Sequence, residues 1–193
     1  SGHNLTEMLR LFRNVDGSTF EDISAWAGLG EARGGFNIVQ ADVDNDGDDD
    51  LYLTHFFSET NTLYRNDGAG RFAVASQELG LGQVGMPWLA FGTCFLDADN
   101  DGDLDLVVTH LAQFPALLRN TDMAPDNWLR LDVGHGRAGT TAEEFAGDAA
   151  VSKQLVGGTS YLTQGDGTLW FGLGDVAAVD SVRVIDPDGQ ATV

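Results

Sequence analysis

Short apolar runs separated by turn residues fill most of this chain. One stretch is predicted to form four β-strands, at 36–42, 51–56, 62–66 and 71–75, because apolar and polar positions alternate there and Gly, Asn and Asp gather in between. Long helical periodicities are few, and the chain has 25 glycines. The pattern therefore predicts an all-β protein.

One acidic stretch occurs twice with the same spacing. "ADVDNDGDDDLYLTH" at 41–55 is matched by "FLDADNDGDLDLVVTH" at 95–110, with Gly47 and Gly102 at equivalent positions. The phrases "LFRNVDGSTF", "LYRNDGAGRF" and "LLRNTDMAPDNWL" each place an apolar pair before Arg-Asn and a turn. A solvated acidic run has no reason to recur with its spacing intact. The period lies slightly above the roughly 40–50 residues of a four-stranded propeller blade.

The pattern D-x-D-x-D-G-x-x-D supplies carboxylates at positions 1, 3, 5 and 9, and a backbone carbonyl is available at position 7. Hard oxygen ligands in this number suit Ca²⁺, which takes about 6–8 of them. An EF-hand would place a glutamate at position 12 and then a helix. Leu53 and Val108 occupy that position, within β-type alternation. The sequence thus favours a calcium loop between two strands over an EF-hand.

With Phe91-Gly92 just ahead of the second copy, the doubled loop resembles the FG-GAP or VCBS repeats of integrin-α-like β-propellers, in which a Ca²⁺ loop links the first two strands of a blade. The resemblance implies two Ca²⁺ sites. The first would use the side chains of Asp42, Asp44, Asp46 and Asp50 and the carbonyl of Asp48. The second would use the side chains of Asp97, Asp99, Asp101 and Asp105 and the carbonyl of Asp103. Asp49, which aligns with Leu104, is expected to be a solvated surface charge.

The last third resembles the ASPIC/UnbV domain of the cartilage-acidic-protein-like family. The matching features are Asn127-Trp128-Leu129, "GGTSYLTQ", "LWFGLGD", "VDSVRV" and "DPDGQ". Strands are expected in "DNWLRLDVGHGR", "DAAVSKQLVGG", "TLWFGLGD" and "VDSVRVIDPDG". "AGTTAEEFAGDAAV" at 138–151 departs from the family's pattern, so no ligand of the family's loop can be assigned there.

These features predict a repeat region at 1–124 and an ASPIC/UnbV-like β domain at 125–193. The repeat region would hold a partial blade at 9–24 and repeats at about 36–76 and 90–121, giving two to three blade-like antiparallel sheets of a partial β-propeller. A closed propeller needs at least about four blades. Exposed strand edges must therefore be covered. Residues 9–24 are expected to pair with the C-terminal strands or, as the favoured alternative, to dock on another chain by strand addition.

Charge narrows the range of partners. The chain carries 10 Lys and Arg against 30 Asp and Glu, a formal charge of −20, and 11 of the acidic residues lie in the two loops. This balance excludes nucleic acid and anionic membrane surfaces as partners, because both attract cationic patches. No apolar run is long enough for membrane insertion, and the start shows no signal peptide. A secreted, periplasmic or cell-surface location is expected, with any signal already removed.

Catalytic signatures are missing from the sequence. There is no G-x-S-x-G, no H-E-x-x-H and no Gly-rich phosphate loop. His55 and His110 are repeat-equivalent, which argues for a structural role, and His3 and His135 are expected at the surface. The four tryptophans sit in apolar runs and are expected to pack in the core. The chain is therefore not expected to be an enzyme.

Two functional interpretations follow. The favoured one is a non-catalytic calcium-binding extracellular module for adhesion, scaffolding or subunit interaction, with a protein or glycan partner. The alternative is a carbohydrate-active extracellular enzyme or its accessory carbohydrate-binding domain. Solvent-facing aromatic residues would favour the alternative, whereas buried aromatic residues and an exposed sheet edge would favour the first.

Overall fold

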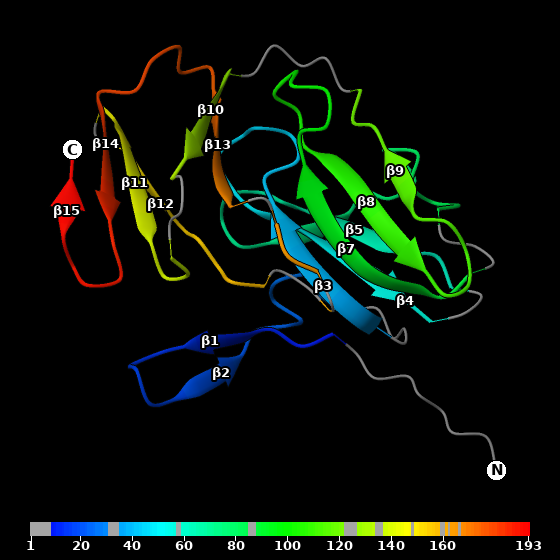
Figure 1. Ribbon diagram of the computed structural model, residues 1–193. Helices are drawn as coiled ribbons and strands as arrows, with labels where there is room; N and C mark the ends of the chain where they lie inside the picture. Colours follow the sequence, from blue (N-terminus) through cyan, green and yellow to red (C-terminus); the bar gives the residue numbers. More distant parts are fainter. Residues whose placement is uncertain are drawn as a thin grey trace. The chain divides into compact units, whose positions relative to one another are not determined.

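In the computed structural model every regular element of the described residues is a β-strand (Figure 1). The described residues are 9–30, 35–56, 59–84, 88–121, 127–133, 137–147, 149–158, 161, 163–165 and 167–193. The predicted all-β class is confirmed for this part of the chain. None of these residues belongs to a helix long and apolar enough to cross a membrane.

The first acidic repeat forms a four-stranded sheet in chain order. Its strands are β3 (Gly35–Ala41), β4 (Asp50–His55), β5 (Thr62–Asn66) and β6 (Phe72–Val74). β4 pairs antiparallel with β5, which places Tyr52 opposite Leu63, and β5 pairs antiparallel with β6. Each strand lies within two residues of the range that the alternation predicted. The acidic loop joins the first two strands, as in the blades that the repeat resembles.

Two shorter sheets complete the repeat region. The second repeat forms β7 (Ala90–Leu96), β8 (Asp105–His110) and β9 (Ala116–Leu118), in the order β7-β8-β9. At the start of the described chain, β1 (Phe12–Asn14) and β2 (Phe20–Asp22) form an antiparallel pair. Since "LFRN" in β1 aligns with "LYRN" in β5, this pair corresponds to the last two strands of a blade. The described residues of the repeat region thus form three blade-like sheets.

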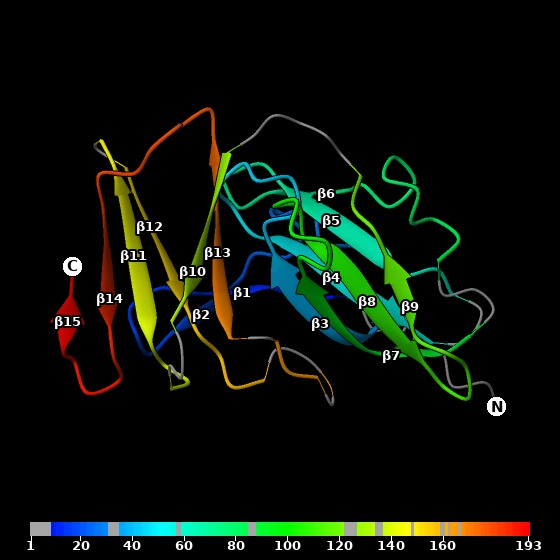
Figure 2. The same cartoon turned by 45° about the horizontal axis from the view of Figure 1, so that its top comes forward.

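The C-terminal strands form two further sheets. β10 (Asn127–Asp132) pairs antiparallel with β13 (Thr168–Gly174), and the two lie side by side in both views (Figure 2). The other sheet has the order β12-β11-β14-β15. Its strands are β11 (Thr141–Ala146), β12 (Ala149–Gln154), β14 (Ser181–Ile185) and β15 (Ala191–Thr192).

The sequence patterns missed β11, although it is a central strand of its sheet. Ala142 and Glu144 are its buried positions, with 0% and 3% exposure. A buried glutamate breaks the apolar alternation by which a strand is recognised. The segment that departs from the family's pattern is therefore a β-hairpin, β11–β12.

The chain divides into two compact units, each with its own core. One comprises Ser1–Gln40, Asp50–Thr93 and Val108–Ala116, and the other Ala41–Asp49, Cys94–Val107 and Leu117–Val193. Buried residues of the first core include Ala27, Leu29, Leu53 and Tyr64, and those of the second are Ala142, Leu169 and Phe171. Most of each acidic loop thus belongs to the same unit as the C-terminal strands. The expected boundary at 124–125 lies outside the described residues.

Candidate metal centre

The two acidic loops share one backbone conformation. Asn45 and Asn100 have φ angles of 58° and 61°, and Gly47 and Gly102 have φ angles of 101° and 98°. Asn and Gly are the residues that adopt positive φ most readily, because most other side chains clash with the backbone there. The Asn and Gly of D-x-D-N-D-G are thus required by the turn itself. The sequence repeat is also a structural repeat.

Matching hydrogen bonds hold the carboxylates of the two loops in place. The amide of Gly47 donates to Asp42 Oδ2 over 3.1 Å, and that of Gly102 donates to Asp97 Oδ2 over 3.2 Å. The amides at position 7, from Asp48 and Asp103, each donate over 3.1 Å to the position-5 carboxylates, Asp46 and Asp101. Hydrogen bonds from the turn's own amides therefore orient the carboxylates at positions 1 and 5 of each loop, without the need for a bound cation.

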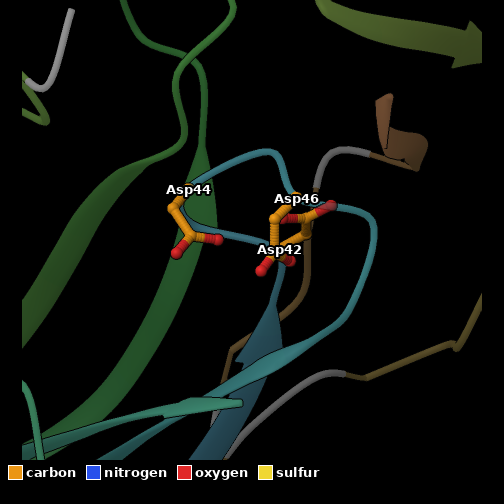
Figure 3. A group of neighbouring side chains, drawn as sticks. All are labelled: Asp42, Asp44 and Asp46. Atoms are coloured by element: carbon orange, nitrogen blue, oxygen red, sulfur yellow. The ribbon is translucent and has the colours of Figure 1, made fainter. Parts of the chain in front are cut away.

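Three carboxylates meet in each loop. One oxygen from each of Asp42, Asp44 and Asp46 lies within 4.8 Å of the others, and Asp97, Asp99 and Asp101 form the equivalent group. Figure 3 shows the first three side chains leaving the loop that follows β3. Like charges at this separation repel each other unless a cation lies among them. The structure thus brings together positions 1, 3 and 5 of both predicted sites.

Asp42 has the most constrained carboxylate of the first group. Its side chain is 2% exposed, and Oδ1 has no hydrogen-bond partner among the described residues. Burial raises the pKa of Asp42 to about 6, and the neighbouring Lys153 opposes the rise. Burial, followed by the charge of Asp46, likewise raises the pKa of Asp48 to about 6. A buried carboxylate oxygen without a donor is costly, and a bound cation would remove that cost.

The position-9 carboxylates have an additional structural role. Asp50 and Asp105 are each 1% exposed, and they accept hydrogen bonds from the amides of Asn66 and Asn120 over 2.7 and 2.8 Å. Ala98 also donates its amide to Asp105 over 3.1 Å. These asparagines belong to the repeated Arg-Asn phrase, which explains why that phrase accompanies the acidic loop. Coordination by Asp50 and Asp105, and by the carbonyls of Asp48 and Asp103, stays a prediction.

A basic side chain lies beside each loop. Lys153 Nζ lies 2.7 Å from Asp49 Oδ1, with side-chain exposures of 14% and 33%. The expectation that Asp49 is a solvated surface charge is therefore wrong. At the second loop, Arg119 forms an ion pair with Asp99 and lies 4.0 Å from Asp101. Lys153 comes from β12, far along the chain, which is why the sequence did not reveal its partner.

The donor set fits a hard cation. Both groups offer only carboxylate oxygens, with neither His nor Cys among them. Hard divalent cations such as Ca²⁺ prefer oxygen ligands, whereas softer metals select nitrogen and sulfur. Asp42 Oδ1, which has no hydrogen-bond partner in the described part of the chain, is a ready ligand atom. The residues present thus fit a calcium ion.

The two repeat-equivalent histidines have different surroundings. His55 is 4% exposed, and its Nε2 lies 2.9 Å from Thr62 Oγ1. The ring of His110 lies 5.7 Å from that of Trp88. Neither histidine belongs to the carboxylate groups. His3 and His135 lie outside the described residues.

Three tryptophans depart from the core packing that the sequence predicted. Trp26, Trp88 and Trp128 are 47%, 41% and 39% exposed. The guanidinium of Arg71 lies 4.9 Å from the ring centre of Trp26, and Trp128 and Trp170 lie 5.5 Å apart. An apolar sequence context did not distinguish a core position from a partly covered surface position.

Two family models match parts of this chain. The FG-GAP-like repeat matches residues 42–108, and the ASPIC and UnbV family matches residues 136–193. The chain is 31% identical over 172 residues to cartilage acidic protein 1 of Mus musculus and of Homo sapiens. It is 29% identical over 171 residues to that of Xenopus tropicalis. Each alignment covers 79% of this chain, which spans about a quarter (25%) of the length of these relatives.

Asp42→Asn should stabilise the calcium-free protein at pH 7. Asparagine keeps an acceptor oxygen for Gly47 but removes the buried charge, for a gain of about 1–3 kcal/mol in the free energy of unfolding. The folded-state pKa is raised to about 6. The protonated Asp42 side chain therefore contributes to stability below the pKa of the unfolded state. This contribution is lost as the pH rises through about 6. Thermal melts in EDTA should show the largest gain at pH 7 and a smaller one at pH 5.

Asp16→Asn is the control for that experiment. Hydrogen bonds, the largest from the Ser18 amide, lower the pKa of the exposed Asp16 to about 2. Its charged form is favoured in the folded state, so Asp16→Asn should not stabilise the protein. A lower melting temperature for Asp42→Asn than for wild type in EDTA at pH 7 would contradict the prediction that the buried charge of Asp42 is destabilising.

Proposed function

We propose that this chain, in which an FG-GAP-like repeat precedes an ASPIC and UnbV segment, is a non-catalytic calcium-binding module that acts outside the cytoplasm in adhesion, scaffolding or subunit interaction. The observation that carries the proposal is the duplicated carboxylate group. In the first copy it includes a buried oxygen of Asp42 that has no hydrogen-bond partner among the residues the structure describes. Neutralising these charges is the chemistry that Ca²⁺ supplies.

Each loop would hold one ion, with oxygen ligands at about 2.3–2.6 Å. The grouped carboxylates of positions 1, 3 and 5 are the primary ligands, and positions 7 and 9 complete the proposed shell. The ligands proposed for the first ion are Asp42, Asp44, Asp46, Asp48 and Asp50, and those for the second are Asp97, Asp99, Asp101, Asp103 and Asp105.

Calcium availability supports a secreted, periplasmic or cell-surface location. Extracellular modules bind Ca²⁺ with Kd values of about 10⁻⁴–10⁻³ M, which suit the millimolar calcium found outside cells. The sequence contains a single cysteine, Cys94, so the chain forms no internal disulfide. Bound calcium would supply the cross-linking that disulfides supply in other small exported domains.

Calcium binding should raise the free energy of unfolding of the protein. Isothermal titration calorimetry should find two sites, and saturation to about 100 Kd should stabilise the folded state by about 2.7 kcal/mol per site. Thermal melts in millimolar Ca²⁺ and in EDTA are the comparison. Asp44→Ala and Asp99→Ala should each remove one site and part of the stabilisation. Asp175→Ala, at an exposed position outside both loops, is the control. Superimposable wild-type melts would refute the proposal.

We further propose that the β1–β2 hairpin docks on another chain by strand addition. β1 and β2 pair with each other, and the described ladders contain no pairing of this hairpin with a C-terminal strand. Phe12, Val15 and Phe20 are 51%, 58% and 64% exposed. Exposed apolar side chains beside unpaired backbone groups are suited to a β-strand partner.

Light scattering in Ca²⁺ tests this assembly. Wild type should form a dimer or a larger species at micromolar concentration, and Phe20→Arg should shift it toward the monomer. Phe114→Arg is the matched control, because Phe114 is 91% exposed and lies outside the hairpin. A wild-type protein that stays monomeric up to the highest soluble concentration would exclude self-association through this edge.

The carbohydrate alternative is favoured by one observation, the exposed tryptophans. Stacking of a sugar ring on an aromatic face is a common mode of glycan binding, and Trp88 is 41% exposed beside His110. A glycan array probed with wild type and with Trp88→Ala separates the two functions. Glycan binding that Trp88→Ala abolishes would support the alternative, whereas a blank array together with two calcium sites would support the module.

A further inference from the structure

β13 of the C-terminal region is bonded directly to the first acidic loop. The amide of Gly172 donates to Asp42 Oδ2 over 3.0 Å, and the amide of Gly174 donates to the carbonyl of Asn45 over 2.9 Å. Both donors lie on β13, and both acceptors lie in the loop after β3. The loop that gathers the carboxylates is therefore also a docking surface for the C-terminal region.

The residue type at position 172 is explained by this contact. A Cβ built on Gly172 would overlap Asp42 Oδ2 and the backbone of Asn45, whereas Gly172 has no positive φ that would itself require glycine. On the loop side, a Cβ on Gly47 would lie 3.5 Å from the carbonyl oxygen of Gly172. Glycine at 172 is thus needed for the close approach of the loop and not for the shape of the strand.

A lysine of the C-terminal region reinforces the same contact. Lys153, on β12, forms the ion pair with Asp49 of the first loop. Its side chain is 14% exposed, so water screens the pair only partly. The extra acid of the first loop, absent from the second, therefore has a partner in the C-terminal region.

The second loop meets the C-terminal region differently. A Cβ on Gly102 would overlap the indole of Trp128, on β10, and Arg130 donates to the side chain of Asn100 over 3.3 Å. Asp97, the equivalent of Asp42, accepts from the amides of Asp101 and Gly102 in its own loop. Asp42, at the first position of the first loop, by contrast accepts a hydrogen bond from the Gly172 amide of β13.

We propose that calcium binding at the first loop and docking of the C-terminal region on that loop stabilise each other, with Asp42 as the shared residue. The inference rests on the proposed calcium site. One oxygen of Asp42 accepts from Gly172, and the other is a candidate ligand. A cation bound at Oδ1 would hold the carboxylate in the position in which Oδ2 accepts the hydrogen bond from the Gly172 amide. Because coupling is reciprocal, docking must raise calcium affinity by the same factor.

Amide hydrogen exchange of the whole chain tests the coupling. Adding Ca²⁺ should slow exchange in the peptide that covers 169–175 by about tenfold, within the usual range of such couplings. Asp46→Asn, which alters a first-loop ligand other than Asp42, should abolish the slowing. Asp101→Asn, the matched change in the second loop, should leave it intact.

The reverse direction is tested by calorimetry. Gly172→Ala should weaken one of the two calcium sites by about tenfold and leave the other unchanged. Gly35→Ala, at a glycine with nothing within 4 Å of its Cβ position, is the control. If Gly172→Ala does not fold, Lys153→Gln serves instead. In that variant the 169–175 peptide should exchange faster than wild type without calcium, and Ca²⁺ should restore its protection.

The outcomes separate the two proposals. Two calcium sites by calorimetry with unchanged exchange at 169–175 would overturn the coupling and leave the calcium module standing. Equal slowing in Asp46→Asn and Asp101→Asn would also overturn it, because the effect would then not belong to the first loop. The absence of any calcium heat would overturn both.

Discussion

Crowding of carboxylates in two short loops is the constraint on which the rest of this structure depends. In each loop, one carboxylate oxygen from each of three acidic residues lies within 4.8 Å of the others, and a backbone amide holds the first carboxylate. Such a turn requires Asn and Gly at positive φ, and its charges require a counter-charge. Position 9 then links the loop to the next hairpin through the amide of Asn66 or Asn120. A large part of each of these two repeats is thus organised around its acidic loop.

The same constraint accounts for two basic residues of the second compact unit. Lys153 and Arg119 each lie beside acidic groups that would otherwise be uncompensated. Lys153 is supplied by the C-terminal region, so this cation also ties that region to the first loop. Arg119 pairs with one carboxylate oxygen, Oδ2, of a proposed ligand, Asp99. The two loops have the same backbone conformation but differ in their electrostatic surroundings.

Strand prediction succeeded and failed for identifiable reasons. The strands of the first repeat were found because they are short, alternate in polarity and are bounded by turn residues. β11 was missed because one of its two buried positions carries Glu144, 3% exposed, and a buried acid looks like a surface position. The tryptophans were misplaced because an apolar neighbourhood in sequence does not reveal how much of a ring the fold covers.

By itself the sequence determined the all-β class, the duplicated loop and the carboxylates at positions 1, 3 and 5, because these depend on local spacing and on turns that Asn and Gly specify. Only the tertiary structure decided that Asp49 pairs with Lys153 and that Gly172 donates to Asp42, 130 residues away in sequence. Such contacts depend on how distant strands pack, and no local pattern encodes that packing.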